Sequence, residues 1–161
     1  EFLYAGGGQE AGRRPGTENL AGIWGLVQSA EKAAAELERH LAKARALMAA
    51  LLAELRSIAQ CRLLPETRAA EPEWFSPWIL SAAFPPIPGE VLVRVADEEG
   101  FLISTGSACS AYKKDRTRVL RAMGVRRELA SCAVRISLGP ATEREDLERF
   151  VEALRRRLPG L

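Results

Sequence analysis

Residues 17 to 57 carry the hydrophobic pattern of one long helix. Apolar residues recur there at steps of three and four, the spacing of neighbours on one helix face. The stripe consists of Leu20, Ile23, Trp24, Val27, Leu37, Leu41, Ala44, Met48, Leu51 and Leu55. A helix of about 40 residues is about 60 Å long, which exceeds a small domain. We therefore expect it either to bend near residues 29–33 or to bridge two domains.

Capping signals mark where this helix and the last helix begin. Thr17 is a predicted N-cap, and Glu18 would lie in the first turn, where the helix dipole favours an anion. Residues 142–145, Thr-Glu-Arg-Glu, match a capping box. They predict a final helix with one apolar face, formed by Leu147, Phe150, Val151, Leu154 and Leu158.

The middle of the chain predicts two further helices and a few short strands. Helices are expected over 88–100, between a proline and a glycine, and over 117–123, before Gly124. Strands are expected at 61–64, 78–84 and 101–104, and at 134–138, where apolar and polar residues alternate. Most of the strands are too close together for βαβ crossovers. The predicted fold class is α+β, with a short, mostly antiparallel sheet packed against helices.

Composition limits the kind of protein. The 161 residues suffice for a hydrophobic core, and a net charge of +2 is too small to indicate nucleic acid or a membrane surface as a partner. No run approaches the roughly 18 apolar residues of a membrane span. Three irregularly spaced cysteines form no disulfide pattern, and the isolated His40 offers no zinc pair. We expect a cytoplasmic protein without a metal site.

Cys109 has the sequence context of a reactive thiol. It lies within Gly106–Ala111, whose small side chains leave a thiol uncovered. Cations follow at positions 113, 114, 116 and 118, and nearby positive charge favours the thiolate. The competing interpretation is a buried cysteine in a tight turn. Cys132, in phase with the apolar residues of the last strand, and Cys61, at the start of the first, are predicted to be structural.

Two other positions are suited to anions. Arg135 lies on the polar face of its strand, where a planar guanidinium can bind a carboxylate through two hydrogen bonds or simply face solvent. The glycine-rich residues 6–16 lead to Thr17 at a helix N-terminus, a location that binds phosphate groups through N–H and hydroxyl donors. Capping the helix and contacting a phosphate are compatible roles for Thr17. The loop is not a Walker A motif, because no Gly-Lys-Ser/Thr follows.

Four segments together resemble the cysteine desulfurases that supply sulfur for iron–sulfur cluster assembly, within the class-V aminotransferases. They are Gly6–Glu10 with Arg14–Asn19, then Ser104–Ser110, Val119–Gly124 and Val134–Gly139. Their order and spacing fit the family, and the resemblance runs nearly end to end. The most specific of the four is the segment that contains Cys109.

The resemblance implies a homodimeric pyridoxal phosphate enzyme of fold-type I that acts on L-cysteine. In the family, a lysine removes the Cα proton of the cofactor-bound substrate, and a loop cysteine attacks the substrate sulfur. The products are alanine and an enzyme persulfide, which is passed to an acceptor or iron–sulfur scaffold protein. By motif, Cys109 matches the nucleophile, Arg135 the residue that binds the substrate carboxylate, and Thr17 the contact to the cofactor phosphate of the other subunit.

The resemblance covers only the C-terminal part of the family pattern. Residues 1–30 match the end of the large cofactor-binding domain and the start of a long connecting helix, and residues 31–161 match the small domain. The family's Schiff-base lysine lies in a Ser-x-His-Lys segment upstream, and no lysine of this chain has that context. We therefore expect the C-terminal portion of a longer enzyme. The alternatives are a non-catalytic sulfur carrier or interaction module, and a related lyase for selenocysteine or cystine.

Overall fold

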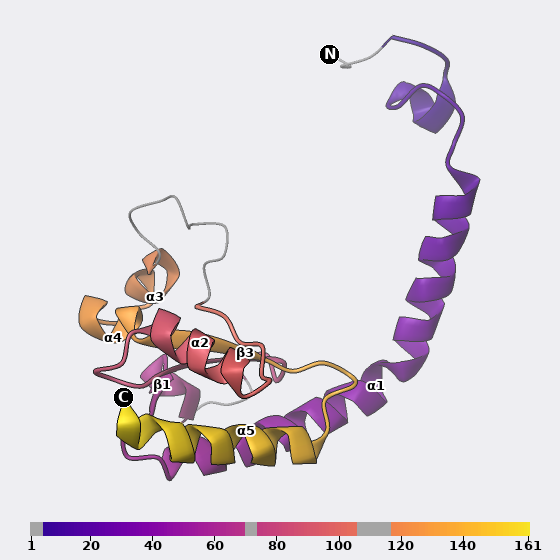
Figure 1. The fold of residues 1–161 in the computed structure, drawn as a ribbon. Coiled ribbons are helices and arrows are strands. Elements are labelled where there is room, and N and C mark those ends of the chain that lie inside the picture. The colour runs from indigo at the N-terminus through magenta and orange to yellow at the C-terminus, as the bar shows by residue number, and fades with distance from the viewer. Residues whose placement is uncertain (1–4, 70–73, 106–116) are drawn as a thin grey trace. The chain divides into compact units, whose positions relative to one another are not determined.

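The structure is a computed structural model that describes residues 5–69, 74–105 and 117–161 (Figure 1). These residues form two compact units, Glu1–Arg39 and His40–Leu161. Helix α1 (Leu20–Arg56) confirms the long helix predicted from the apolar stripe. The division between the two units falls within this helix. The assignment of residues 1–30 and 31–161 to two family domains stays a prediction. In the parts that the structure describes, no helix is both long and apolar enough to cross a membrane.

The first unit contains the glycine-rich loop, the short 3-10 helix η1 (Gln9–Gly12) and the first part of α1. The cap predicted at Thr17 is wrong. The helix begins at Leu20, and Asn19 caps it, because its Oδ1 accepts a hydrogen bond from the backbone N–H of Gly22 at 3.0 Å. Asparagine is at least as good an N-cap as threonine. Glu18 consequently precedes the first turn, and Thr17 is left for another role.

The second unit is built on a three-stranded antiparallel sheet in the order β1 (Arg62–Leu64), β2 (Ile79–Ala83) and β3 (Ala133–Ser137). This confirms the α+β class and three of the four expected strands. The fourth, at 101–104, is reduced to a single bridge between Ser104 and Arg135.

One face of the sheet carries the main hydrophobic core. Helix α2 (Gly89–Glu98), helix α5 (Arg144–Arg157) and the part of α1 from Leu47 onward all bury apolar residues in this core. The sheet contributes Leu80, Ala82, Val134 and Ile136, and the helices contribute Leu51, Leu55, Leu92, Phe150, Val151 and Leu154 among others. Each fully buried leucine, valine, isoleucine or phenylalanine side chain stabilises the fold by about 1.5–3 kcal/mol. The helix predicted over 88–100 is confirmed, although its β-branched residues alone would favour a strand.

On the opposite face of the sheet, the described residues pack at one end. The short helices α3 (Arg118–Ala122) and α4 (Arg127–Ser131) adjoin a small second cluster there. Its buried members are Leu64, Ala83, Cys132 and Ala133. Cys132 is thus buried as predicted, but the expected layer is wrong. The residue follows the last turn of α4, so the alternation of β3 does not extend back to it.

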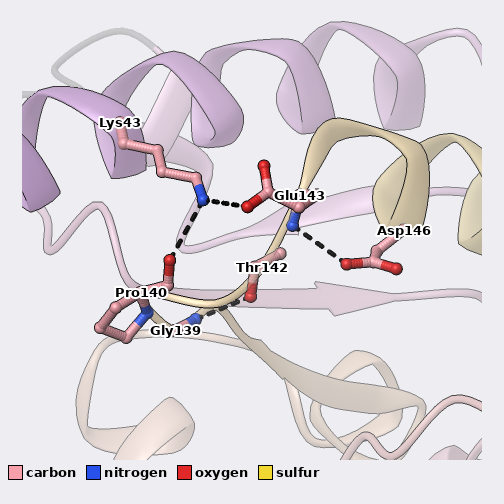
Figure 2. A network of polar contacts seen from close by, with 6 residues as sticks. All are labelled: Lys43, Gly139, Pro140, Thr142, Glu143 and Asp146. Carbon is pink, nitrogen blue, oxygen red and sulfur yellow. Dashed lines mark hydrogen bonds and ion pairs between the residues drawn. The ribbon is translucent and has the colours of Figure 1, made fainter.

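Helix α5 runs beside the C-terminal part of α1 in the same direction. Near its start, Lys43 Nζ donates to Glu143 Oε1 at 2.6 Å and to the carbonyl oxygen of Pro140 at 3.1 Å, as Figure 2 shows. Near its end, Arg155 pairs with Glu54 at 2.7 Å. The capping box also lies here, but at Glu143 and Asp146, one residue later than predicted.

Gly89 allows α2 to pack directly on β3. A Cβ atom at this buried position would meet the carbonyl oxygen of Ala133 and lie 3.2 Å from its carbonyl carbon. The backbone of Ala133 is held in the sheet by its pairing with β2 and cannot rotate away as the end of a side chain can. We expect Gly89→Ala to lower the free energy of unfolding by about 1–3 kcal/mol, the usual cost of overpacking, although alanine favours helices.

Urea denaturation followed by circular dichroism measures this effect. The matched control is Gly25→Ala on the exposed part of α1, where a Cβ atom has nothing within 4 Å. That control should leave stability unchanged or raise it by up to about 1 kcal/mol. A Gly89→Ala protein as stable as the parent would contradict the close packing of α2 on β3.

Candidate functional site

Arg135 lies on the second face of the sheet, at the end away from the small second cluster. Arg135 of β3 pairs in register with Ser81 of β2, and Ser137 pairs with Ile79. Directly opposed residues of antiparallel strands point to the same face, so these four side chains share one surface. Among the described residues, Arg135, Ser137 and Ile79 are exposed and Ser81 is half-buried, since the small second cluster lies at the other end of this face. An exposed guanidinium on a rigid strand is suited to binding a carboxylate.

The chain that leads to Cys109 is attached to the same strand. The backbone N–H of Ser104 donates to the carbonyl oxygen of Arg135 at 3.1 Å, and the N–H of Arg135 donates to the oxygen of Ser104 at 2.5 Å. Cys109 itself lies outside the described residues and follows Ser104 by five positions. The structure therefore places Arg135 next to the last described residues before the cysteine segment.

The two described cysteines differ from a reactive thiol. Burial raises the pKa of the Cys61 thiol to about 11, and the charge of Arg62 offsets this only in part. The thiolate is the reactive form, so Cys61 stays protonated and unreactive near neutral pH. Cys132 is buried in the small second cluster. Both locations agree with the structural roles predicted for these residues.

Thr17 belongs to the other unit and follows a tightly folded loop. Its side chain is exposed, and its carbonyl oxygen accepts a hydrogen bond from Arg14 Nη1 at 3.2 Å. A Cβ atom at Gly6 would meet the ring of Pro15, so the two ends of the loop touch. Gly16, with φ of +100°, turns the chain into Thr17. The exposed hydroxyl suits a phosphate oxygen, which accepts hydrogen bonds.

Two of the described side chains suit anions, Thr17 by its exposed hydroxyl and Arg135 by its exposed guanidinium. Residues 5–69, 74–105 and 117–161 contain no group of three or more His, Cys, Asp or Glu side chains that could hold a metal ion. Lys43 is engaged with Glu143 and Pro140 in the contact between α1 and α5. The residues fit a phosphate at Thr17 and a carboxylate at Arg135, and Lys43 serves helix packing.

Two contacts, one in each unit, were not predicted from the sequence. The first is the pairing of Ser104 with Arg135, which joins segments that are far apart in the chain. The second is the hydrogen bond from the Gly16 N–H to Gln9 Oε1 at 3.2 Å. The signal in the sequence was that Gln9, Gly16, Ser104 and Arg135 all lie inside the segments that carry the family resemblance.

Comparison with known proteins gives a consistent result. The family model "Aminotransferase class-V" matches residues 5–150. The chain is 34% identical over 155 residues to "Cysteine desulfurase IscS" of Clostridium botulinum (strain Hall), a match that covers 94% of this chain and 38% of that protein. It is 33% identical over 149 residues to "Cysteine desulfurase NifS" of Azotobacter vinelandii, which covers 92% of this chain and 36% of that protein.

A solved structure described as a NifS-like protein has the same arrangement of elements. It matches with a TM-score of 0.80 and 32% identity, over 99% of this chain and 39% of that one. The chain thus spans less than two-fifths of the length of each of these similar proteins.

Proposed function

The chain belongs to the class-V aminotransferase family, and from this premise we propose that it is the C-terminal part of a cysteine desulfurase. The substrate would be L-cysteine and the products alanine and a persulfide on Cys109. The sulfur would then pass to an acceptor protein, such as an iron–sulfur scaffold. The support is the similarity to proteins named cysteine desulfurase, together with the pairing of Ser104 and Arg135.

Cys109 is the proposed nucleophile. Its thiolate attacks the substrate sulfur, so a bond forms between the two sulfurs while the substrate Cβ–S bond breaks. The electron pair of the broken bond stays with the carbon fragment, which takes up protons and leaves as alanine. Pyridoxal phosphate, when bound, supplies the electron sink that makes the carbon–sulfur bond labile. Cations at positions 113, 114 and 116 would favour the thiolate.

Arg135 is the proposed partner of the substrate carboxylate. Its guanidinium can form two parallel hydrogen bonds to the two carboxylate oxygens, which fixes the orientation as well as the position of the amino acid. The pairing of Ser104 with Arg135 supports this division of roles. Five residues of extended chain span at most about 18 Å, so Cys109 is tethered within that range of the Ser104 backbone.

Thr17 is the proposed contact to the cofactor phosphate. Its exposed hydroxyl can donate to a phosphate oxygen, and the family resemblance assigns this contact to the other subunit of a homodimer. In the longer protein, a lysine outside this chain would hold the cofactor covalently and move the Cα proton. Thr17 of one subunit and Arg135 of the other would then bind the two anionic ends of the same reacting complex.

The direct test uses the full-length protein that carries this chain. Purified with pyridoxal phosphate and given L-cysteine and a reductant, it should release alanine and sulfide in equal amounts. Without reductant, mass spectrometry should find one extra sulfur on Cys109. Absence of alanine would contradict the proposal. An extra sulfur acquired only from an added sulfur donor, again without alanine, would favour the non-catalytic sulfur carrier.

A further inference from the structure

The glycine-rich loop before Thr17 is closed by one side chain. Gln9 Oε1 accepts a hydrogen bond from the backbone N–H of Gly16 at 3.2 Å. The Gln9 amide lies where a side chain on Gly7 would be, since a Cβ atom there would meet it. The Gln9 side chain thereby connects the start of the loop, at Gly7, with Gly16, the residue that immediately precedes Thr17.

The backbone on both sides of Thr17 is held. On one side, Gly16 has a φ of +100°, a conformation that only glycine adopts readily, and its N–H is bound by Gln9. On the other side, Arg14 Nη1 donates to the carbonyl oxygen of Thr17 at 3.2 Å. The Thr17 side chain stays exposed between these two contacts.

We propose that Gln9 is a positioning residue for the cofactor phosphate. It fixes the Pro15–Gly16 peptide, to which the bound N–H belongs, while Arg14 holds the Thr17 carbonyl, so the Thr17 hydroxyl between them is already oriented before a phosphate binds. This inference rests on the proposed contact between Thr17 and the phosphate. A preorganised donor avoids the entropy cost of ordering the loop during binding. Loss of one neutral hydrogen bond should weaken binding by about threefold to tenfold.

The test is a double-mutant cycle in the full-length protein that carries this chain. Gln9→Met keeps the length of the side chain and removes the acceptor, and Thr17→Val removes the hydroxyl with little change of shape. Dissociation constants are measured for pyridoxal phosphate and for pyridoxal, which lacks the phosphate. Gln28→Met, at an exposed position on α1 in the same unit, is the matched control.

Gln9→Met should weaken binding of pyridoxal phosphate about threefold to tenfold and leave binding of pyridoxal unchanged. The same substitution should have no further effect in the Thr17→Val protein. Equal weakening for both ligands, or the same loss in both backgrounds, would overturn the role of Gln9 while the desulfurase proposal stands. If Thr17→Val alone leaves phosphate-dependent binding unchanged, the assignment of Thr17 fails.

A second measurement, in the full-length protein that carries this chain, needs no bound cofactor. NMR of the Gly16 amide reports its exchange with solvent directly. We expect faster exchange in Gln9→Met than in the parent and in Gln28→Met. Equally fast exchange in all three proteins would show that Gln9 does not close the loop, whatever the cofactor affinities are.

Discussion

Replacing Cys109 by serine in the full-length protein should reduce the formation of alanine from L-cysteine by roughly 100-fold or more when no reductant is present. A serine hydroxyl is scarcely ionised near neutral pH and cannot form the disulfide-type bond that holds the departing sulfur. Binding of L-cysteine to the cofactor should persist, because Arg135 and Thr17 are untouched. The measurements are the initial rate of alanine release and the absorbance change on addition of L-cysteine.

Cys61 provides the matched control for this experiment. Its pKa of about 11 means that roughly one thiol in a thousand is ionised at pH 8, and alkylation of it should accelerate only as the pH rises toward 11. Cys61→Ser should keep the parent rate. Iodoacetamide at pH 7 should modify Cys109 first and remove activity in parallel. An undiminished rate in Cys109→Ser, or loss of activity in Cys61→Ser alone, would contradict the assignment.

The features of the fold that could be predicted are those that depend on local periodicity. The apolar faces of α1 and α5 and the alternation along β3 each follow from one short stretch of sequence. The same alternation put Arg135 on the polar face, where the structure has it exposed. The inference failed at Cys132, because α4 ends there and no strand continues backward. A five-residue helix is too short to show a period, so α4 itself was not predicted.

The misplaced cap of α5 reflects one local and one tertiary contact. At the start of α5, Thr142 was the better N-cap by type. Its Oγ1 instead accepts a hydrogen bond from the Gly139 N–H at 2.9 Å within the preceding turn. Glu143 then caps the helix and also pairs with Lys43 of α1 (Figure 2). A partner this distant in the chain cannot be read from local sequence.

The same limit applies to the candidate site. Motif resemblance supplied Cys109, Arg135 and Thr17 one at a time, without a spatial relation among them. The bridge between Ser104 and Arg135 supplies one such relation, since it joins the segment before Cys109 to the strand of the arginine. That bridge uses backbone atoms only. Substitution of the Arg135 side chain can therefore test substrate binding without detaching the segment.

Arg135→Gln should lower kcat/KM for L-cysteine by about 10-fold to 150-fold, mainly through a higher KM. A hydrogen bond to a charged group contributes about 1.5–3 kcal/mol, and each 1.4 kcal/mol corresponds to a factor of ten. Arg135→Lys should recover only part of the loss, because an ammonium group lacks the paired geometry of a guanidinium. Stability should change by no more than about 0.5 kcal/mol, since the side chain is exposed.

Cysteamine, which is L-cysteine without its carboxylate, isolates the interaction. If Arg135 binds the carboxylate, the parent protein should bind cysteamine weakly and Arg135→Gln should bind it equally weakly. Arg127→Gln, at an exposed position on α4, is the matched control and should leave both ligands unaffected. A parent-like KM for L-cysteine in Arg135→Gln would contradict the role of this residue. An equal loss for cysteamine would instead indicate that the substitution disturbs the sheet face rather than a contact to the carboxylate.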